Sequence, residues 1–304
     1  MKQIFQYLDS GETKIIELPP PRLKKGEVLI QSKFSLISSG TERMLLNFGK
    51  SNLILKAKNQ PEKVSEVIAK IKSEGIFNTL EAVSNKLDKP LPLGYCNAGI
   101  IVKVGEDVSS FKVGDRVVSN GYHAELVTVS ENLCALIPDE VSFEDAAFTV
   151  IAAVGLQGIR LLNPTLGETI AVSGLGIIGL ITCQLLKANG CKVLGIDPDQ
   201  SKCDLANSFG VETFCISKKS NPTNWCLSKT KGVGVDGFLV TASTSSSDPI
   251  FIAANSSRKK GRIILVGVTG LDLNRELFYK KELTFQVSCS YGPGRYDKNY
   301  EEDN

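Results

Sequence analysis

The sequence predicts a β-rich domain over residues 1–148, followed by an α/β domain with a doubly wound parallel sheet over residues 149–288. Three observations support this fold class. Short apolar segments punctuated by glycine and proline fill the first half, strands and helices alternate through the second half, and a glycine-rich loop joins one strand to one helix. The length of 304 residues also favours about two domains.

The first half contains five segments that are typical of short strands, separated by the proline run 19–21 and by turn residues such as Gly105, Gly114 and Gly121. The segments are residues 14–18, 27–31, 99–104, 116–118 and 124–129. Their spacing predicts a partly open β-barrel.

Residues 44–90 interrupt this pattern with two candidate helices, the first opened by Pro61. Their apolar positions recur at helical spacing, at Val64, Val67, Ile68 and Ile71 and again at Ile76, Phe77, Leu80, Val83 and Leu87. We expect this helical insert to pack as an amphipathic pair on its own barrel, because an apolar helix face normally meets a core. A lid or a partner surface is the alternative.

The second half begins with a helix start at Ser142, with an acid three residues on at Asp145 and the apolar run 146–159 behind it. Strand candidates are 170–173, 192–196, 213–216, 236–240, 262–266 and 283–288, and helix candidates are 177–188, 200–208, 222–229 and 248–258. Six strands with intervening helices make a complete doubly wound sheet, which holds its ligand at the carboxyl ends of the strands.

The most informative motif is the loop Gly174-Leu175-Gly176-Ile177-Ile178-Gly179, which lies between a predicted strand and a predicted helix. Its first glycine allows a tight turn, the second lets the backbone approach a pyrophosphate, and the third lets the helix pack on the strand. The N-terminus of the helix favours phosphate groups. This context predicts dinucleotide binding, and a glycine-rich turn of an unrelated α/β domain is the alternative.

Asp197 ends the next predicted strand, 18 residues after Gly179, and its carboxylate can accept hydrogen bonds from the adenosine ribose. The residues that follow it, Pro198, Asp199 and Gln200, include no arginine that would bind a 2′-phosphate. The sequence therefore predicts NAD(H) rather than NADP(H).

Two more pairs of residues, Thr241 with Ala242 and Gly267 with Val268, follow predicted strands at their carboxyl ends. Because the carboxyl ends of parallel strands share one edge of the sheet, we expect these four residues to line the cofactor site as well.

Composition excludes several other classes of function. The 35 basic and 33 acidic residues nearly cancel, which argues against nucleic acid or an anionic membrane as a partner. The uncharged stretch 170–186 contains three glycines and fits strand, loop and helix better than a membrane span. The eight cysteines form no C-x-x-C pair and are typical of small core residues, and the N-terminus has no secretory signal. We expect a cytoplasmic protein.

The order of a GroES-like β domain and a Rossmann domain, together with residues 105–118 and the loop 174–179, resembles the medium-chain dehydrogenase/reductase superfamily. Residues 39–44, 90–95 and 290–297 resemble, more narrowly, bacterial two-part oxidoreductases in which such a module precedes a Gfo/Idh/MocA-type domain. The resemblance implies that Lys202 bonds the cofactor ribose.

Zinc enzymes of this superfamily hold a catalytic zinc with Cys, His and Cys. By resemblance, Ser39 stands at the first ligand position, Tyr95 and Cys96 follow Gly94 where a His-Glu pair is found, and the third position falls near Thr149. Neutral hydroxyls do not replace thiolates, so we expect a zinc-free relative with no metal ligands.

Without zinc, another group must carry the proton. The resemblance suggests three catalytic candidates: Thr41, which matches the start of a proton relay; Tyr95; and His123, which matches a residue of the substrate cleft. Histidine's ordinary pKa of about 6.5 suits reversible proton transfer. The alternatives are a turn residue for Thr41, a packing aromatic with its hydroxyl satisfied for Tyr95, and a half-buried barrel residue bonded to backbone for His123.

The sequence thus favours a zinc-independent NAD(H)-dependent oxidoreductase acting on an alcohol or carbonyl of a polar small molecule, with a sugar derivative implied by resemblance alone. A quinone- or enone-type double-bond reductase and a non-catalytic dinucleotide-binding module that serves a partner domain are the alternatives. Residues 289–304 resemble the start of a return segment that is longer in the superfamily. We expect this tail to fray, the catalyst to be incomplete, and an apolar strip to need a homo-oligomer or a partner domain to cover it.

Overall fold

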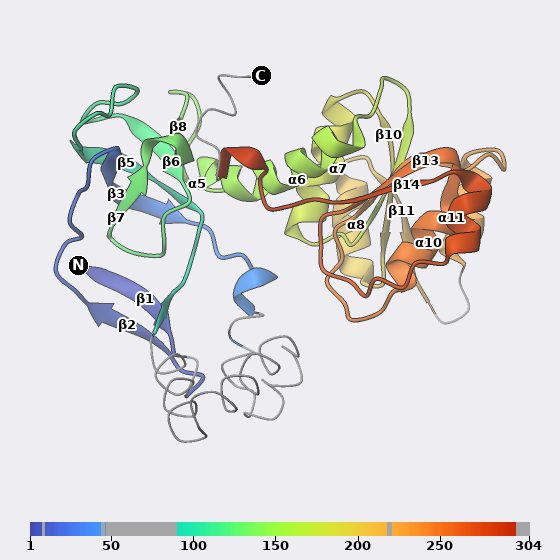
Figure 1. Cartoon of the computed structure of the whole chain (residues 1–304), viewed down its shortest axis with the longest axis horizontal. Coiled ribbons are helices and arrows are strands. Elements are labelled where there is room, and N and C mark those ends of the chain that lie inside the picture. The colour runs from blue at the N-terminus through green and yellow to red at the C-terminus, as the bar shows by residue number, and fades with distance from the viewer. Residues whose placement is uncertain (8–9, 44–45, 47–89, 218–220, 296–304) are drawn as a thin grey trace, which may run out of the picture. The chain divides into compact units, whose positions relative to one another are not determined.

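The computed structural model describes residues 1–7, 10–43, 46, 90–217 and 221–295. The chain divides into two compact units, Met1–Val150 and Ile151–Asn304, which are described separately (Figure 1). The predicted insert helices lie outside the described residues, and so does most of the tail, residues 296–304.

The first unit is built from two antiparallel sheets. The larger has the order β7-β3-β5-β6-β8 and the smaller the order β2-β1-β4. Their strands are β1 (Lys2–Gln6), β2 (Thr13–Glu17), β3 (Glu27–Ser35), β4 (Leu91–Pro92), β5 (Asn97–Val104), β6 (Arg116–Ser119), β7 (Leu126–Ser130) and β8 (Cys134–Leu136). Alternate side chains of the larger sheet point inward, and Val28, Ile30, Ile101, Val117 and Val127 form its core.

The prediction missed three of these strands and ended a fourth too early. β1 was missed because Lys2, Gln3 and Gln6 hide its apolar pattern, and β4 and β8 were missed because they are only two and three residues long. β3 continues four residues beyond the predicted end, to Ser35, since register shifts after Leu29 and Ser32 break the strict alternation that the sequence pattern requires. The extension matters for the candidate site, because Ser35 at its end contacts the ring of His123.

The second unit is a six-stranded parallel sheet of order β11-β10-β9-β12-β13-β14, as predicted. Its strands are β9 (Thr169–Ser173), β10 (Lys192–Asp197), β11 (Glu212–Cys215), β12 (Val235–Val240), β13 (Ser257–Leu265) and β14 (Thr284–Val287). Its helices are α6 (Thr149–Leu162), α7 (Ile177–Ala188), α8 (Gln200–Ser208), α9 (Pro222–Lys229), α10 (Asp248–Ser256) and α11 (Arg275–Lys281). The short helix α5 (Phe143–Ala146) precedes them, in the first unit. It begins at the predicted cap, where Ser142 Oγ accepts from the Asp145 N–H at 3.0 Å.

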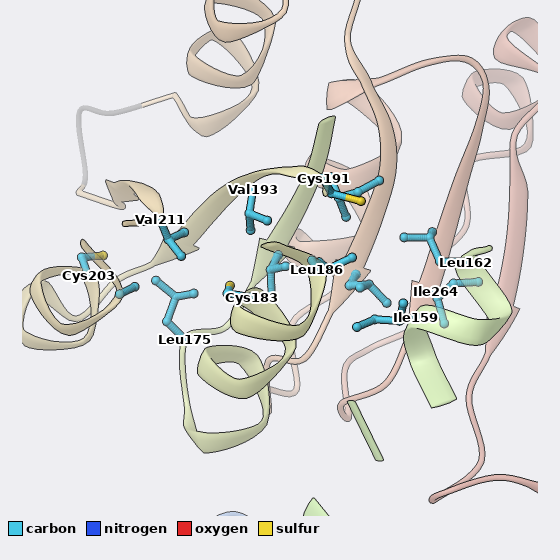
Figure 2. Close-up of a cluster of buried hydrophobic side chains, with 14 residues drawn as sticks. Ile159, Leu162, Leu175, Cys183, Leu186, Cys191, Val193, Cys203, Val211 and Ile264 are labelled. Atoms are coloured by element: carbon cyan, nitrogen blue, oxygen red, sulfur yellow. The ribbon is translucent and has the colours of Figure 1, made fainter. Parts of the chain in front are cut away.

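Helices cover both faces of this sheet. Side chains of α6, α7 and α8 pack on one face with strand residues such as Val193 and Ile264, and Figure 2 shows this cluster. Side chains of α9 and α10, with partly buried residues of α11, pack on the other face around Phe238. Two buried faces explain why the strands appear in the sequence as nearly continuous apolar runs.

Three elements of this unit differ most from the prediction. β13 begins at Ser257, five residues before the predicted start. α10 ends at Ser256 and not at residue 258, and the Lys281 ammonium lies at that end, where it donates to the carbonyls of Ala254, Asn255 and Ser257. α11 was missed because only a few of its residues are apolar. Among the described residues, no helix has both the length and the apolar character needed to cross a membrane.

Candidate functional site

The glycine-rich loop follows β9 and needs glycine at two positions. Gly174 has φ +98°, and a Cβ there would lie 2.5 Å from the backbone nitrogen of Ala242. A Cβ on Gly179 would collide with the carbonyl oxygen of Gly174. A Cβ on Gly176 would meet nothing within 4 Å, so the space before the N-terminus of α7 is open.

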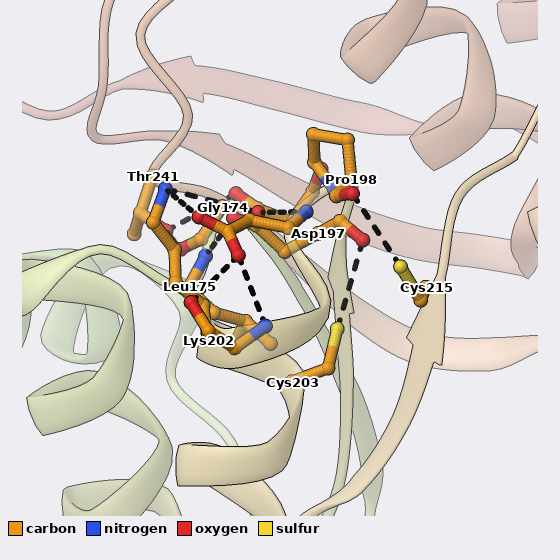
Figure 3. Close-up of polar contacts among 11 residues, drawn as sticks. Gly174, Leu175, Asp197, Pro198, Lys202, Cys203, Cys215 and Thr241 are labelled. Carbon is orange, nitrogen blue, oxygen red and sulfur yellow. Dashed lines mark hydrogen bonds and ion pairs between the residues drawn. The ribbon is translucent and has the colours of Figure 1, made fainter.

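Asp197 lies at the end of β10 beside this loop, as Figure 3 shows. Its Oδ2 accepts from the backbone N–H of Leu175 at 2.7 Å, and its Oδ1 accepts from the N–H of Asp199 at 2.9 Å. The Lys202 ammonium stands 3.9 Å from Oδ1 and 3.8 Å from the Asp199 carboxylate. Each oxygen of the buried Asp197 carboxylate thus has one backbone donor and keeps a second acceptor position.

The other predicted cofactor residues meet the loop at the carboxyl edge of the sheet. Thr241 Oγ1 donates to the Gly174 carbonyl at 2.6 Å. The Val268 N–H donates to the Ala242 carbonyl at 3.0 Å, and a Cβ on Gly267 would collide with that same carbonyl. The structure therefore brings the ends of β9, β10, β12 and β13 together around one loop.

These residues fit a dinucleotide. The open space at Gly176 and the N-terminus of α7, which has no side-chain cap, suit a pyrophosphate. The buried Asp197 carboxylate suits the hydroxyl groups of a ribose, and Lys202 lies within reach of the same group.

A separate polar cluster lies in the first unit, where the structure brings Thr41 and Tyr95 together. The Tyr95 hydroxyl stands 2.6 Å from Ser38 Oγ and 3.3 Å from Thr41 Oγ1. Ser38 is buried, Tyr95 is half-buried and Thr41 is exposed. The Tyr95 hydroxyl is therefore satisfied by two neighbouring hydroxyl groups, which fits both a catalytic tyrosine and a packing aromatic whose hydroxyl is bonded.

His123 lies in the same unit, and both nitrogens of its ring contact side chains. Its Nδ1 is 2.8 Å from Ser35 Oγ, and its Nε2 is 3.1 Å from Glu42 Oε2. The side chains of His123 and Glu42 are only 5% and 6% exposed. The other oxygen of Glu42 accepts from the N–H of Ser38 at 2.8 Å, so the acid links His123 to the Tyr95 side of the cluster.

Sequence reasoning missed Ser35, Ser38 and Glu42 as members of this cluster. The only signal was an acid directly after Thr41, within the motif 39–44. Gly94 packs against His123 and leaves no room for a side chain. It has φ +94°, and a Cβ there would lie 2.6 Å from the backbone nitrogen of His123 and 2.7 Å from its ring.

Two of the positions matched to zinc ligands carry the exposed Ser39 and the half-buried Tyr95, and the third falls near Thr149, which opens α6. Cys96, which follows Tyr95, is buried. Within the part of the chain that the structure describes, no three side chains of His, Cys, Asp or Glu are grouped so that they could hold a metal ion.

The sequence matches two family models, one after the other along the chain. The first describes an alcohol dehydrogenase GroES-like domain and matches residues 64–141. The second describes a zinc-binding dehydrogenase and matches residues 178–302.

Individual proteins are similar over much of their length. The chain is 26% identical over 243 residues to a probable D-xylulose reductase A of Neosartorya fischeri, covering 68% of each protein. It is 31% identical over 211 residues to the D-guloside 3-dehydrogenase of Escherichia coli, covering 65% of this chain and 59% of that one. The solved structure of galactitol-1-phosphate dehydrogenase from Escherichia coli has a TM-score of 0.75 at 21% identity, covering 99% of this chain and 87% of that one. The predicted combination of a GroES-like domain and a Rossmann-like sheet is confirmed.

Proposed function

We propose a specific activity for this chain, which belongs to the medium-chain dehydrogenase/reductase, or alcohol-dehydrogenase-like, superfamily. It is an oxidoreductase, and we propose that it uses NAD(H), needs no zinc, and interconverts an alcohol and a carbonyl in a sugar or sugar derivative. The observation that carries the cofactor assignment is the Asp197 carboxylate, buried against the glycine-rich loop.

The second unit would hold the cofactor through residues already described. The loop 174–179 and the start of α7 would bind the phosphates, while Asp197 and Lys202 would bind the ribose. A 2′-phosphate would place its negative charge against the Asp197 carboxylate, which favours NAD(H). A bound nicotinamide supplies the hydride donor or acceptor.

Zinc independence is supported by the side chains at the matched ligand positions. Ser39 and Tyr95 offer neutral hydroxyls, and the hydroxyl of Tyr95 is already bonded within the Ser38–Thr41 turn. Zinc sites in proteins use thiolate, imidazole and carboxylate ligands. The family model that matches residues 178–302 is described as a zinc-binding dehydrogenase, but Ser39 and Tyr95 offer none of these ligand types.

The proton would then be handled by side chains of the first unit. Tyr95 and Thr41 present linked hydroxyls, of which Thr41 is exposed, and His123 is the only imidazole in the chain. We assign Tyr95 and Thr41 to contact with the reacting oxygen and His123 to proton storage.

The substrate class is supported by the relatives, whose names describe a D-xylulose reductase and a D-guloside 3-dehydrogenase. A direct test is turnover of D-xylulose with NADH and of methyl glycosides with NAD⁺. Reduction of quinones or enones alone would replace the proposal with a double-bond reductase. Binding of NADH with no turnover of any of these would replace it with a non-catalytic module.

The cofactor and zinc assignments have their own test. Titration by fluorescence should give a dissociation constant for NADH at least about tenfold below that for NADPH, because a charged hydrogen bond contributes about 1.5–3 kcal/mol. Equal constants would overturn the NAD(H) assignment. Protein dialysed against a chelator should keep its turnover, and loss of activity that zinc restores would overturn zinc independence.

A further inference from the structure

A buried acid and a buried histidine in the first unit have no explanation in packing alone. Glu42 and His123 are almost fully removed from water, and burial of an ionisable side chain is unfavourable unless it is paired. Their mutual contact at 3.1 Å provides that pairing. The second ring nitrogen of His123 leads outward, to the hydroxyl of Ser35 at 2.8 Å.

The contacts fix the direction of the hydrogen bonds. An ionised carboxylate can only accept, so the proton of neutral His123 lies on Nε2, facing Glu42 Oε2. Nδ1 then has a free lone pair and accepts from the Ser35 hydroxyl. The three side chains form a base held by an acid on one side and linked to a hydroxyl on the other, which is the arrangement that activates proton transfer in many enzymes.

Only one end of this set reaches water. Ser35 is exposed at the last position of β3, whereas His123 and Glu42 are buried. Neither ring nitrogen of His123 is free, since each already has a partner within the unit. Ser35 therefore gives His123 a route for exchanging a proton with water in which the contact to Glu42 stays intact.

The backbone holds the set rigidly. The His123 N–H donates to the Leu93 carbonyl at 2.8 Å, and its carbonyl accepts from the Ile4 N–H at 3.0 Å. Glu42 is bonded twice to Ser38, through its Oε1 at 2.8 Å and through its own N–H at 3.0 Å. Side chains held on both sides in this way keep the geometry that a proton relay needs.

We propose that Ser35, His123 and Glu42 form a proton relay that connects His123 with bulk water. In the inward direction, a water molecule gives a proton to Ser35 Oγ while the Ser35 hydroxyl proton moves to His123 Nδ1, which leaves hydroxide outside and an imidazolium beside the Glu42 carboxylate. The outward direction reverses both transfers. Glu42 is the positioning residue: it fixes the tautomer and stabilises the imidazolium. The catalytic role of the relay rests on the proposed oxidoreductase function.

Nuclear magnetic resonance can test the relay directly, because His123 is the only histidine in the chain and gives the only imidazole signals. Long-range proton–nitrogen spectra of the ¹⁵N-labelled full chain should show neutral His123 with its proton on Nε2. Glu42→Gln should shift the population towards the other tautomer, and Glu106→Gln, an exposed acid of the same unit, should not. A wild-type spectrum with the proton on Nδ1 would overturn the relay.

Turnover of D-xylulose with NADH then tests its role. Ser35→Ala should lower kcat by at least about tenfold with little change in KM or in NADH affinity, and higher concentrations of imidazole buffer should restore part of the loss. Ser109→Ala, an exposed serine of the same unit, is the matched control. An unchanged kcat in Ser35→Ala would overturn the role of the relay. A wild-type chain that turns over no substrate would overturn the proposed function and the catalytic role together, and the spectra would still decide the geometry.

Discussion

Asp197→Asn is the substitution that tests the cofactor site most directly. The carboxylate accepts two backbone hydrogen bonds, from Leu175 at 2.7 Å and from Asp199 at 2.9 Å. An asparagine keeps only one acceptor oxygen, so its amide NH₂ must face one of the two N–H groups. One charge-assisted bond is lost and one donor is left without its partner.

The magnitude follows from these contacts. Loss of a hydrogen bond to a charged group costs about 1.5–3 kcal/mol, so we expect the free energy of unfolding of the second unit to fall by about 2 kcal/mol. With a urea m-value of about 2 kcal/mol/M, the midpoint should fall by about 1 M. Loss of the bond to the ribose should raise the dissociation constant for NADH by about 10- to 100-fold.

Fluorescence of Trp225, the only tryptophan, reports on the second unit because it lies in α9. Urea unfolding followed by Trp225, and NADH titration of the native protein, measure the two effects separately. The matched control is Asp199→Asn, whose side chain is 47% exposed and caps α8. Asparagine caps helices equally well and the ion pair of Asp199 with Lys202 is exposed, so the control should change midpoint and affinity much less than Asp197→Asn does. An Asp197→Asn protein with wild-type affinity for NADH would refute the assignment of the ribose site.

Three further predictions concern other parts of the chain. Gly94→Ala should destabilise the first unit more than Gly114→Ala does, as measured by circular dichroism on heating, because both have φ near +95° but only Gly94 is crowded, by His123. Burial raises the pKa of the Cys183 thiol from 9.0 to about 12. The unfolded chain therefore releases this proton above about pH 9 while the folded chain keeps it, so stability is lost as pH rises from about 9 to about 12. Between pH 8 and 10.5 the free energy of unfolding, measured with urea, should fall by about 2 kcal/mol more in the wild type than in Cys183→Ala. Equal losses in the two proteins would contradict this prediction. Metal analysis of purified protein should find no stoichiometric zinc, and one zinc per chain would show that donors other than Ser39 and Tyr95 build a site.

The second unit could be predicted closely from sequence because its strands are buried on both faces. Residues 170–173 and 192–196, for example, fall within one residue of β9 and β10. Apolar runs could not locate α11, because this helix packs only part of one face against the sheet and its sequence is mostly polar. In the first unit the bulges of β3 changed the side-chain period, and no sequence pattern marks a bulge.

The turn after β9 could be predicted because Gly174 and Gly179 each have a local steric reason, and the order of strand, loop and helix is visible in the sequence. The polar cluster could not be predicted as a unit. Glu42 and His123 are 81 positions apart, and their contact depends on two other elements. In β1, the Ile4 N–H donates to the His123 carbonyl; in the Leu93–Gly94 turn, the Leu93 carbonyl accepts from the His123 N–H and Gly94 lies against the ring. Sequence comparison pointed to Thr41, Tyr95 and His123 singly, and only the fold shows that Ser38 and Glu42 connect them.

The cluster also has a consistent electrostatic explanation. A carboxylate buried at Glu42 needs a positive or proton-donating partner, because an unpaired buried charge is strongly unfavourable. Among the described residues, no group of three His, Cys, Asp or Glu side chains is placed to hold a dication near the acid. His123 supplies the donor instead, and it can carry a full positive charge when a proton arrives through Ser35. The need to balance a buried carboxylate therefore explains why His123 is paired with Glu42, and this pairing is what the proposed proton transfer by side chains of this unit requires.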